Sequence, residues 1–263
     1  MRKYKKIGLS VALLLGCIAG NGIYYGIKDT RQFDAVQQEN ETGRQGSMTQ
    51  VTEQTATEQT SEQSTTEDAM GKVLEERRKN PLLLLVNKTH ELSENYDVTL
   101  ATLPDGHQVA ESVYDDLMDM LSDAEEAGYS VIVASAYRTR QRQEQLLQQE
   151  IRKNRWNGMT QKEAEADALL TVAPYGYSEH ETGYVVDLVA SNNQMLDDTQ
   201  ETTGANIWLR RNCQRYGFIL RYPKGKEDIT GYSYESWHFR YVGKAAAKEM
   251  TEEHVTLEEY LNE

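Results

Sequence analysis

The sequence predicts an α+β domain with a mostly antiparallel central sheet and flanking helices, preceded by a single transmembrane helix. Apolar residues recur at helical spacing in several segments, while other short segments are rich in β-branched and aromatic residues and are bounded by glycine or polar residues. These segments do not alternate as regular strand–helix–strand units, so a parallel, doubly wound sheet is not expected.

The order of elements follows from their local signals. Val113, Leu117 and Met120 keep helical spacing, and Gly128 supplies a stop. Thr139 precedes a second helix, and Thr160 begins a third, with Glu163 completing a capping box. Further helices are expected over 207–216 and from 245, with one more possible turn over 257–261, and strands over 129–135, 183–189, 218–222 and 237–242.

The N-terminus has the pattern of a membrane anchor. A basic cluster over residues 1–6 precedes a run without charged residues over 7–27, and roughly 20 apolar residues span a bilayer. We expect residues 1–28 to anchor the chain in the cytoplasmic membrane through 7–27, with the rest extracytoplasmic. A lipoprotein modified at Cys17 and a cleaved, secreted form are the alternatives, and both also export the domain.

Composition divides the remaining chain into three parts. Residues 29–79 contain Thr/Ser-Glu-Gln triplets and few aliphatic side chains, so they cannot bury enough apolar surface to order themselves and should form a disordered tether. Order should begin near Asn80. The folded domain is expected over 80–250, followed by a C-terminal tail over 251–263.

Charge and cysteine content exclude several classes of function. The formal net charge is −14, which argues against a nucleic-acid partner because phosphate binding needs a basic surface. Only two cysteines occur, so neither a disulfide framework nor a cysteine-rich zinc finger is expected, and Cys213 fits a buried structural thiol on a helix. A metal site in this chain would therefore use histidine and carboxylate ligands.

Two segments contain the residues that suggest chemistry, 177–187 and 234–243. They supply two imidazoles and one carboxylate, His180, Asp187 and His238, with Glu235 close by. A catalytic zinc site needs three protein ligands of this kind and one open position, and it activates water for attack. Glu235 fits the general base that takes the proton of this water and passes it to the leaving amine.

The period of a β-strand constrains where these residues lie. Side chains alternate between faces, so His180 and Asp187 cannot share one face of a straight strand, and neither can Glu235 and His238. We expect His180 on a loop before the strand that carries Asp187. By the same parity, Glu235 should lie in the turn before the strand that carries His238. His90, His107 and His254 fit ordinary structural or surface histidines.

The two segments resemble the paired motifs S-x-H-x-x-G-x-x-x-D and E-x-W-H of the D-Ala-D-Ala metallopeptidase family, whose fold hedgehog signalling domains share. A third match, over 135–139, resembles the family's S-x-Y-R-[ST] segment, and the resemblance spans about 80–248. It is closest to the VanY-type D,D-carboxypeptidases and also fits the related L,D-carboxypeptidases. Val185 replaces the usual alanine two positions before the aspartate, a change that should not disturb ligation.

The resemblance implies roles for single residues. His180, Asp187 and His238 would bind one Zn²⁺, and Glu235 would be the general base. Arg138 would bind the substrate carboxylate or polarise the scissile carbonyl, which suits a planar guanidinium. Further substrate-binding positions are Gln143, Ser178 and Trp237, although Trp237 could equally be a core aromatic residue that packs the strand.

The function implied is a zinc D-alanyl-D-alanine carboxypeptidase that removes the terminal D-Ala from peptidoglycan stem peptides or their lipid-linked precursors. An L,D-carboxypeptidase that acts on tetrapeptide stems is the first alternative. A catalytically silent peptidoglycan-binding module is a second, and the presence of Glu235 with all three ligands argues against it. An endopeptidase would need a cleft open at both ends, whereas a carboxylate-binding Arg138 favours a closed one.

Overall fold

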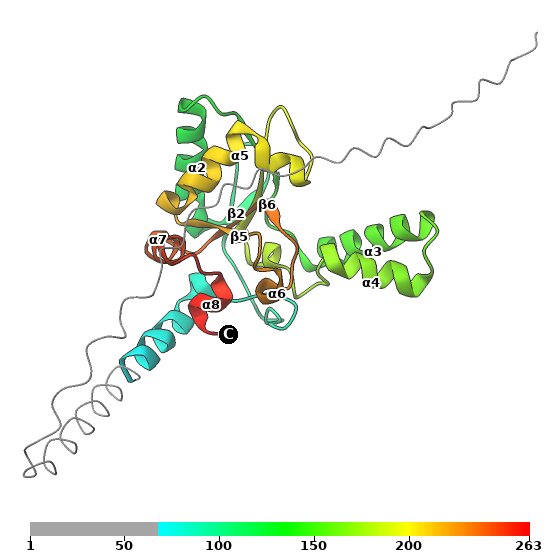
Figure 1. Ribbon diagram of the computed structural model, residues 1–263, viewed down its shortest axis with the longest axis horizontal. Helices are drawn as coiled ribbons and strands as arrows, with labels where there is room; N and C mark the ends of the chain where they lie inside the picture. The colour runs from blue at the N-terminus through cyan, green and yellow to red at the C-terminus, as the bar shows by residue number, and fades with distance from the viewer. Residues whose placement is uncertain (1–67) are drawn as a thin grey trace, which may run out of the picture. The chain divides into compact units, whose positions relative to one another are not determined.

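The computed structural model describes residues 68–263, and the expected anchor over 1–28 lies outside this part of the chain. Within residues 68–263, no helix is long and apolar enough to cross a membrane. The described elements run from a helical segment at 68–79 to a short helix that ends the chain (Figure 1).

A four-stranded antiparallel sheet forms the centre of the fold, in the order β3-β4-β6-β5. The strands are β3 (Val131–Ser135), β4 (Val185–Ala190), β6 (Glu235–Tyr241) and β5 (Phe218–Tyr222). Every residue of β4 is buried, as expected for a central strand that is covered on both faces. This sheet confirms the predicted α+β class.

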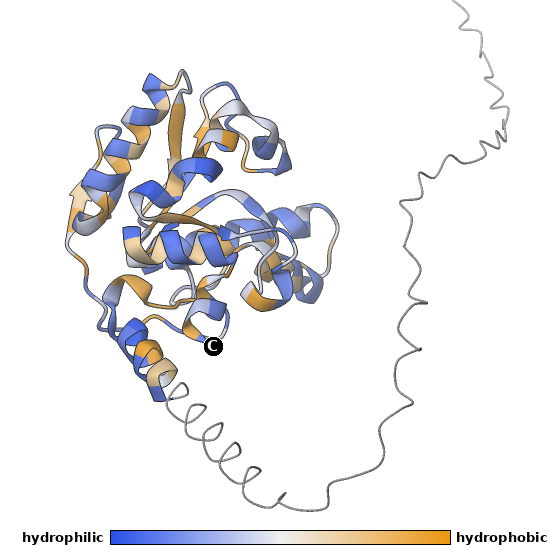
Figure 2. Cartoon of the chain, turned by 60° about the vertical axis from the view of Figure 1, so that its left-hand side comes forward, coloured by the Kyte–Doolittle hydropathy of each residue, from blue (hydrophilic) through white to orange (hydrophobic). Residues whose placement is uncertain are grey.

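Helices α2 (Glu111–Glu126) and α5 (Gly204–Asn212) pack against the sheet. Their inward residues, among them Val113, Leu117 and Leu209, join Phe218 and Phe239 of the strands in the main hydrophobic core. Figure 2 shows this as apolar strands beneath helices whose outer faces are hydrophilic. The fold also contains short elements, namely the hairpin of β1 (Leu100–Thr102) and β2 (Gln108–Ala110), η1 (Pro81–Leu83), η3 (Asp198–Thr202), η4 (Cys213–Tyr216) and α6 (Glu227–Thr230).

The expected helix over 207–216 is divided in two. It begins at Gly204, three residues earlier than predicted, because the Thr203 side chain accepts a hydrogen bond from the backbone N–H of Asn206 and caps it. Its last turn tightens into the 3-10 helix η4, where Cys213 is buried in the core, as expected. Burial raises the pKa of the Cys213 thiol to about 12.

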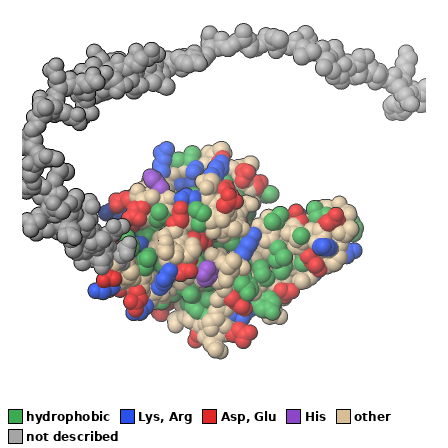
Figure 3. Space-filling view, turned by 60° about the horizontal axis from the view of Figure 1, so that its bottom comes forward, with side chains coloured by type: hydrophobic (Ala, Val, Ile, Leu, Met, Phe, Trp, Pro, Cys, Tyr) green, Lys and Arg blue, Asp and Glu red, His purple; other side chains and the backbone are tan. Residues whose placement is uncertain are grey.

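Helices α3 (Arg140–Trp156) and α4 (Gln161–Thr171) form a hairpin that projects from the body (Figure 1). Thr139 caps α3, and Thr160 with Glu163 forms the predicted capping box of α4. The hairpin has its own small apolar core. In the space-filling view it is a separate lobe with hydrophobic side chains where it meets the body (Figure 3).

The C-terminal residues are not a tail. After α7 (Lys244–Glu253), the chain forms α8 (Leu257–Leu261), whose Leu257, Tyr260 and Leu261 are buried in a second apolar core. Sequence analysis assigned 251–263 to a tail, although it allowed one more helical turn over 257–261, and that turn is α8. The capping box of Thr256 and Glu259 and the three apolar side chains are sufficient to fold and dock it.

The last part of the expected tether also differs from the prediction. Residues 68–79 are helical, and Arg77 and Arg78 donate hydrogen bonds to the backbone oxygens of Tyr260 and Leu261. The Arg77 guanidinium also lies 3.6 Å from the centroid of the Tyr260 ring. Composition alone could not predict this helix. It is held mainly by contacts of its arginines with the C-terminal helix, and it contributes few buried apolar side chains of its own.

Candidate metal centre and active site

The three predicted ligands converge beside the two central strands of the sheet, β4 and β6. His180 lies on the 3-10 helix η2 (Glu179–Thr182), Asp187 on β4 and His238 on β6, where Asp187 and His238 are direct partners in the antiparallel register. One possible ligand atom from each residue lies within 4.8 Å of the others, and all three side chains are buried. The structure therefore brings together the whole predicted ligand set, with His180 before its strand as expected.

A glycine sets the position of η2. Gly183 ends η2 with a φ of +79°, a left-handed conformation that favours glycine. A Cβ at this position would lie 3.0 Å from the backbone nitrogen of Ala110, which donates a hydrogen bond to the Gly183 carbonyl oxygen at 2.9 Å. The turn that places His180 above β4 thus needs a residue without a side chain.

A backbone contact orients His180. Its Nδ1 lies 2.7 Å from the carbonyl oxygen of Ala136, which can only accept, so Nδ1 carries the proton and Nε2 is left with a lone pair. That Nε2 lies 3.3 Å from Asp187 Oδ2. Burial and the Arg138 guanidinium lower the pKa of His180, which favours the neutral imidazole that binds metals.

The second imidazole, that of His238, faces Asp187 with Nδ1, whereas His180 faces it with Nε2. His238 Nδ1 lies 3.3 Å from Asp187 Oδ1 and 3.3 Å from Glu235 Oε2. Burial alone would raise the pKa of the Asp187 carboxyl, but the imidazoles of His180 and His238 lower it below its ordinary range. Asp187 Oδ1 is buried and has no hydrogen-bond partner among the described residues. Two imidazole nitrogens and an unpartnered carboxylate oxygen form a donor set that fits zinc.

Glu235 lies beside the ligands, but its position differs from the prediction. It is the first residue of β6 and not part of the preceding turn. An irregularity in the ladder explains the difference, because one residue of β5 stands opposite three of β6 between the pairs Tyr222–Glu235 and Leu220–Phe239. The bulge interrupts the alternation of faces, so Glu235 and His238 can meet although three positions separate them.

Arg138 reaches the same site from the loop after β3. Its Nε donates to Ser135 Oγ at 3.0 Å, its Nη1 to Gln143 Oε1 at 3.4 Å and its Nη2 to Asp187 Oδ2 at 3.2 Å. The Arg138 side chain is 20% exposed and lines the cavity, so part of the guanidinium is open to a substrate. Buried Gln143 is fixed in turn by a hydrogen bond from Nε2 to the carbonyl oxygen of Ala173 at 2.7 Å.

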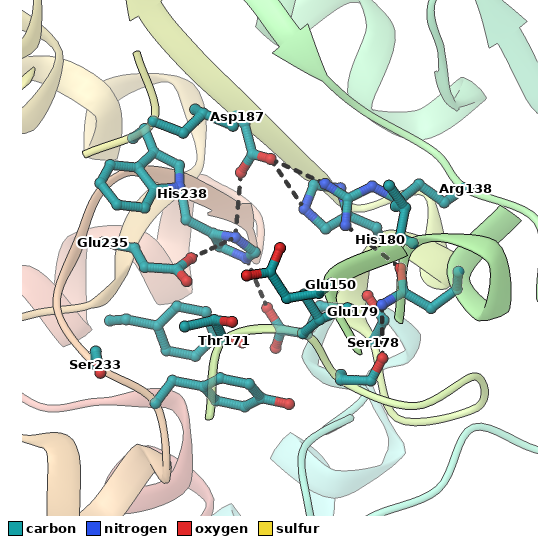
Figure 4. Close-up of a pocket in the computed structure, with 18 of the residues that line it drawn as sticks. Arg138, Glu150, Thr171, Ser178, Glu179, His180, Asp187, Ser233, Glu235 and His238 are labelled. Atoms are coloured by element: carbon teal, nitrogen blue, oxygen red, sulfur yellow. Dashed lines mark hydrogen bonds and ion pairs between the residues drawn. The ribbon is translucent and has the colours of Figure 1, made fainter. Parts of the chain in front are cut away.

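These groups line one cavity of about 590 Å³, which runs from the metal centre along α3. Ser178 and Trp237 also line it, and α3 contributes Glu150 and Lys153. In the close-up, His180, Asp187, Glu235 and His238 point toward one another, with Arg138 beside His180 (Figure 4). His90, His107 and His254 are not among the residues that line the cavity.

Sequence analysis missed one residue at this centre, Glu179. It is buried and faces the side of His238 away from Asp187, with His238 Nε2 3.6 Å from Glu179 Oε2. Burial would raise the pKa of its carboxyl, but Arg221 and Arg240 lower it below its ordinary range. The sequence does contain a signal, because these arginines stand within apolar strand segments and therefore need a buried acidic partner.

Comparison with known proteins agrees with this geometry. The model of the VanY family, described as D-alanyl-D-alanine carboxypeptidase, matches residues 106–244. A D-alanyl-D-alanine carboxypeptidase of Enterococcus faecalis (strain ATCC 700802 / V583) is 38% identical over 182 residues, which are 68% of this chain and 65% of that relative. The match thus spans slightly less than two thirds of the relative's length.

Two solved structures are each similar over about 70% of the chain. The vancomycin resistance D,D-pentapeptidase VanY from a VanB-type resistance cassette, in complex with Zn(II), is 36% identical with a TM-score of 0.63, covering 69% of this chain and 99% of that one. The LdcB LD-carboxypeptidase is 36% identical with a TM-score of 0.59, covering 70% of this chain and 88% of that one. The family match covers more than half of the chain and includes all three ligand positions, and the chain therefore belongs to the VanY D-alanyl-D-alanine carboxypeptidase family of peptidases.

Proposed function

We propose that this protein is a zinc-dependent D-alanyl-D-alanine carboxypeptidase that removes the terminal D-Ala from peptidoglycan stem peptides. The observation that carries the proposal is the convergence, in one cavity, of a His/Asp metal site, a carboxylate at 3.3 Å from a ligand, and a partly exposed guanidinium. The D,D-carboxypeptidase relative and the zinc-bound structure of similar fold support it.

Zinc would be held by His180 Nε2, Asp187 and His238 Nδ1. When bound, it supplies Lewis-acid chemistry that activates water as a nucleophile near neutral pH and polarises the scissile carbonyl. The Ala136 carbonyl oxygen holds the His180 imidazole by a hydrogen bond, and the Glu179 carboxylate faces His238 Nε2 at 3.6 Å. This prior orientation keeps the two ligand nitrogens directed at the same point.

Glu235 would move the proton. Its side chain is 19% exposed, so its carboxylate borders both the ligands and the cavity. It takes a proton from the attacking water as the oxygen adds to the carbonyl carbon, and it gives this proton to the nitrogen of the departing D-Ala as the C–N bond breaks. The products are the shortened stem peptide and free D-Ala, with one water consumed.

Arg138 would make the enzyme an exopeptidase. Three of its N–H groups are used by Ser135, Gln143 and Asp187, and the open edge keeps further donors for a substrate oxygen. A guanidinium pairs with a terminal carboxylate more strongly than with a neutral carbonyl. Binding of the free carboxylate would place the last peptide bond next to the metal centre, and Gln143 and Ser178 would line the peptide site.

The stereochemistry at the scissile bond distinguishes this proposal from its alternative. The LdcB LD-carboxypeptidase and the D,D-pentapeptidase are both 36% identical to this chain, so an L,D-carboxypeptidase acting on tetrapeptide stems is the second candidate. The test is to incubate the purified protein with pentapeptide and tetrapeptide stems and to measure released D-Ala. Faster release from the pentapeptide supports D,D activity, the reverse supports L,D activity, and release from neither favours a silent binding module.

The location of the enzyme is part of the proposal. The uncharged run over 7–27 with its basic flank favours a single-pass anchor in the cytoplasmic membrane, and the active domain would face outward toward stem peptides and their lipid-linked precursors. Protease added to intact protoplasts should release an active soluble fragment. Full protection of the domain from protease would place it in the cytoplasm and contradict the proposed topology.

A further inference from the structure

A buried ionic network lies directly behind the metal centre. Arg221 and Arg240 are fully buried, and both donate to Glu179 Oε1, from Arg221 Nε at 2.8 Å and from Arg240 Nη1 at 2.9 Å. Arg221 also binds Glu258 of α8 with both Nη groups, at 2.8 and 2.6 Å. Asn87 donates to the same Glu258 carboxylate at 3.2 Å, so the network joins the sheet to the C-terminal helix.

The network ends at a metal ligand. Glu179 uses Oε1 for both arginines, and its Oε2 faces His238 Nε2 at 3.6 Å (Figure 4). Both of these atoms are buried, and neither has a hydrogen-bond partner among the described residues. A proton on Nε2 pointing at Glu179 leaves the lone pair on Nδ1, the nitrogen that faces Asp187.

Stability alone is a poor reason for this arrangement. Desolvation of buried ions commonly offsets their mutual attraction, and apolar residues of similar volume are often at least as stabilising. Fixing the ring and the tautomer of a metal ligand, by contrast, is a common use of a carboxylate behind a histidine. The hydrogen bonds from both arginines orient the Glu179 carboxylate, and the Glu258 carboxylate in turn orients Arg221.

We propose that Glu179 is a positioning residue that holds His238 with Nδ1 toward the metal, and that α8 supports this residue through the Glu258–Arg221 pair. The C-terminal helix, which lies outside the residues matched by the family model, is then part of the support of the metal site. The inference rests on zinc at the proposed ligands, and it does not depend on the substrate.

The first test compares two neighbouring glutamates of α8. Glu258→Gln weakens the pair with Arg221 and leaves Arg221 bound to Glu179, whereas Glu259→Gln removes contacts to Lys226 and to the Thr256 cap on the same helix. The zinc dissociation constant of each purified full-length variant is measured by competition with a chromophoric chelator. Glu258→Gln should weaken zinc binding roughly tenfold, and Glu259→Gln should change it by less than about twofold.

The second test acts on the positioning residue itself. Glu179→Gln should weaken zinc binding by roughly ten- to a hundredfold, and the melting temperature of the metal-free protein is recorded for every variant. A merely structural role would lower that melting temperature without changing the affinity of the folded protein for zinc. If Glu179→Gln does not fold, Glu258→Gln decides alone, because it leaves each arginine with a buried carboxylate.

Wild-type zinc affinity in a folded Glu258→Gln variant would overturn the role of α8, and wild-type affinity in a folded Glu179→Gln variant would overturn the whole proposal. Equal weakening by Glu258→Gln and Glu259→Gln would also contradict it, because that result reports general loosening of the helix. Failure of the proposed peptidase function would give a different result. In that case the wild-type protein binds zinc but releases no D-Ala from either stem.

Discussion

Replacement of Arg138 by alanine should abolish the preference for a free C-terminal carboxylate. One edge of the guanidinium is open to the cavity, and the contacts to Ser135, Gln143 and Asp187 hold it in place. Loss of one charge-assisted hydrogen bond to a substrate carboxylate costs about 1.5–3 kcal/mol. This corresponds to a roughly ten- to 150-fold loss in kcat/KM.

The assay is a cycle of two proteins and two substrates. Wild type and Arg138→Ala are each measured with a pentapeptide stem that ends in a carboxylate and with its C-terminal amide. Wild type should cleave the acid much faster than the amide, and Arg138→Ala should treat the two alike, because either change removes the same interaction. Arg138→Lys should recover little, since an ammonium cannot reproduce the planar fork.

Arg138 also contacts the metal ligand Asp187, so the zinc content of each variant is determined alongside the kinetics. Fully additive losses, with zinc retained, would refute the reasoning and assign Arg138 to the scissile carbonyl. Equal cleavage of acid and amide by wild type would indicate an endopeptidase.

Three further predictions follow from particular contacts. Glu235→Gln should retain zinc and lower kcat by roughly 10²–10⁴, the usual share of a general base, whereas loss of zinc would make Glu235 a ligand. Because burial raises its pKa to about 12, Cys213 should resist iodoacetamide at pH 8 in a Cys17→Ser background until the protein is unfolded, and fast labelling of the native protein would contradict its burial. Gly183→Ala should lower the free energy of unfolding by roughly 1–3 kcal/mol more than Gly106→Ala, because only the former Cβ meets a backbone atom, and equal urea midpoints would refute this.

Helix caps and short apolar runs in the sequence predicted the helices and strands whose boundaries depend on neighbouring residues. The capping box of Thr160 and Glu163 marked the start of α4, and the apolar run over 218–222 coincided with β5. The family resemblance supplied the ligand set, and the alternation of strand faces predicted that His180 lies on a segment before β4, which the structure confirms. Each of these predictions depends on residues close together in the chain.

The remaining features depend on contacts between distant residues. Glu235 was misplaced because a bulge opposite β5 cannot be deduced from the sequence of β6 alone. The sequence indicates a turn over 257–261 but not its place in the domain, because its burial depends on a core shared with residues such as Leu83, more than 170 positions earlier. Glu179 was missed because its role becomes visible only when Arg221, Arg240 and His238 surround it.

The measurement that tests the central claim most directly is a zinc titration of the metal-free enzyme, followed by release of D-Ala from a pentapeptide stem. Activity should be absent in chelator, rise in proportion to added zinc and level off at about one equivalent, as expected for a single three-ligand site. His238→Ala should bind no stoichiometric zinc and release no D-Ala. Release of D-Ala by the metal-free protein, or an unchanged titration after removal of His238, would contradict the assignment of this site as the catalytic centre.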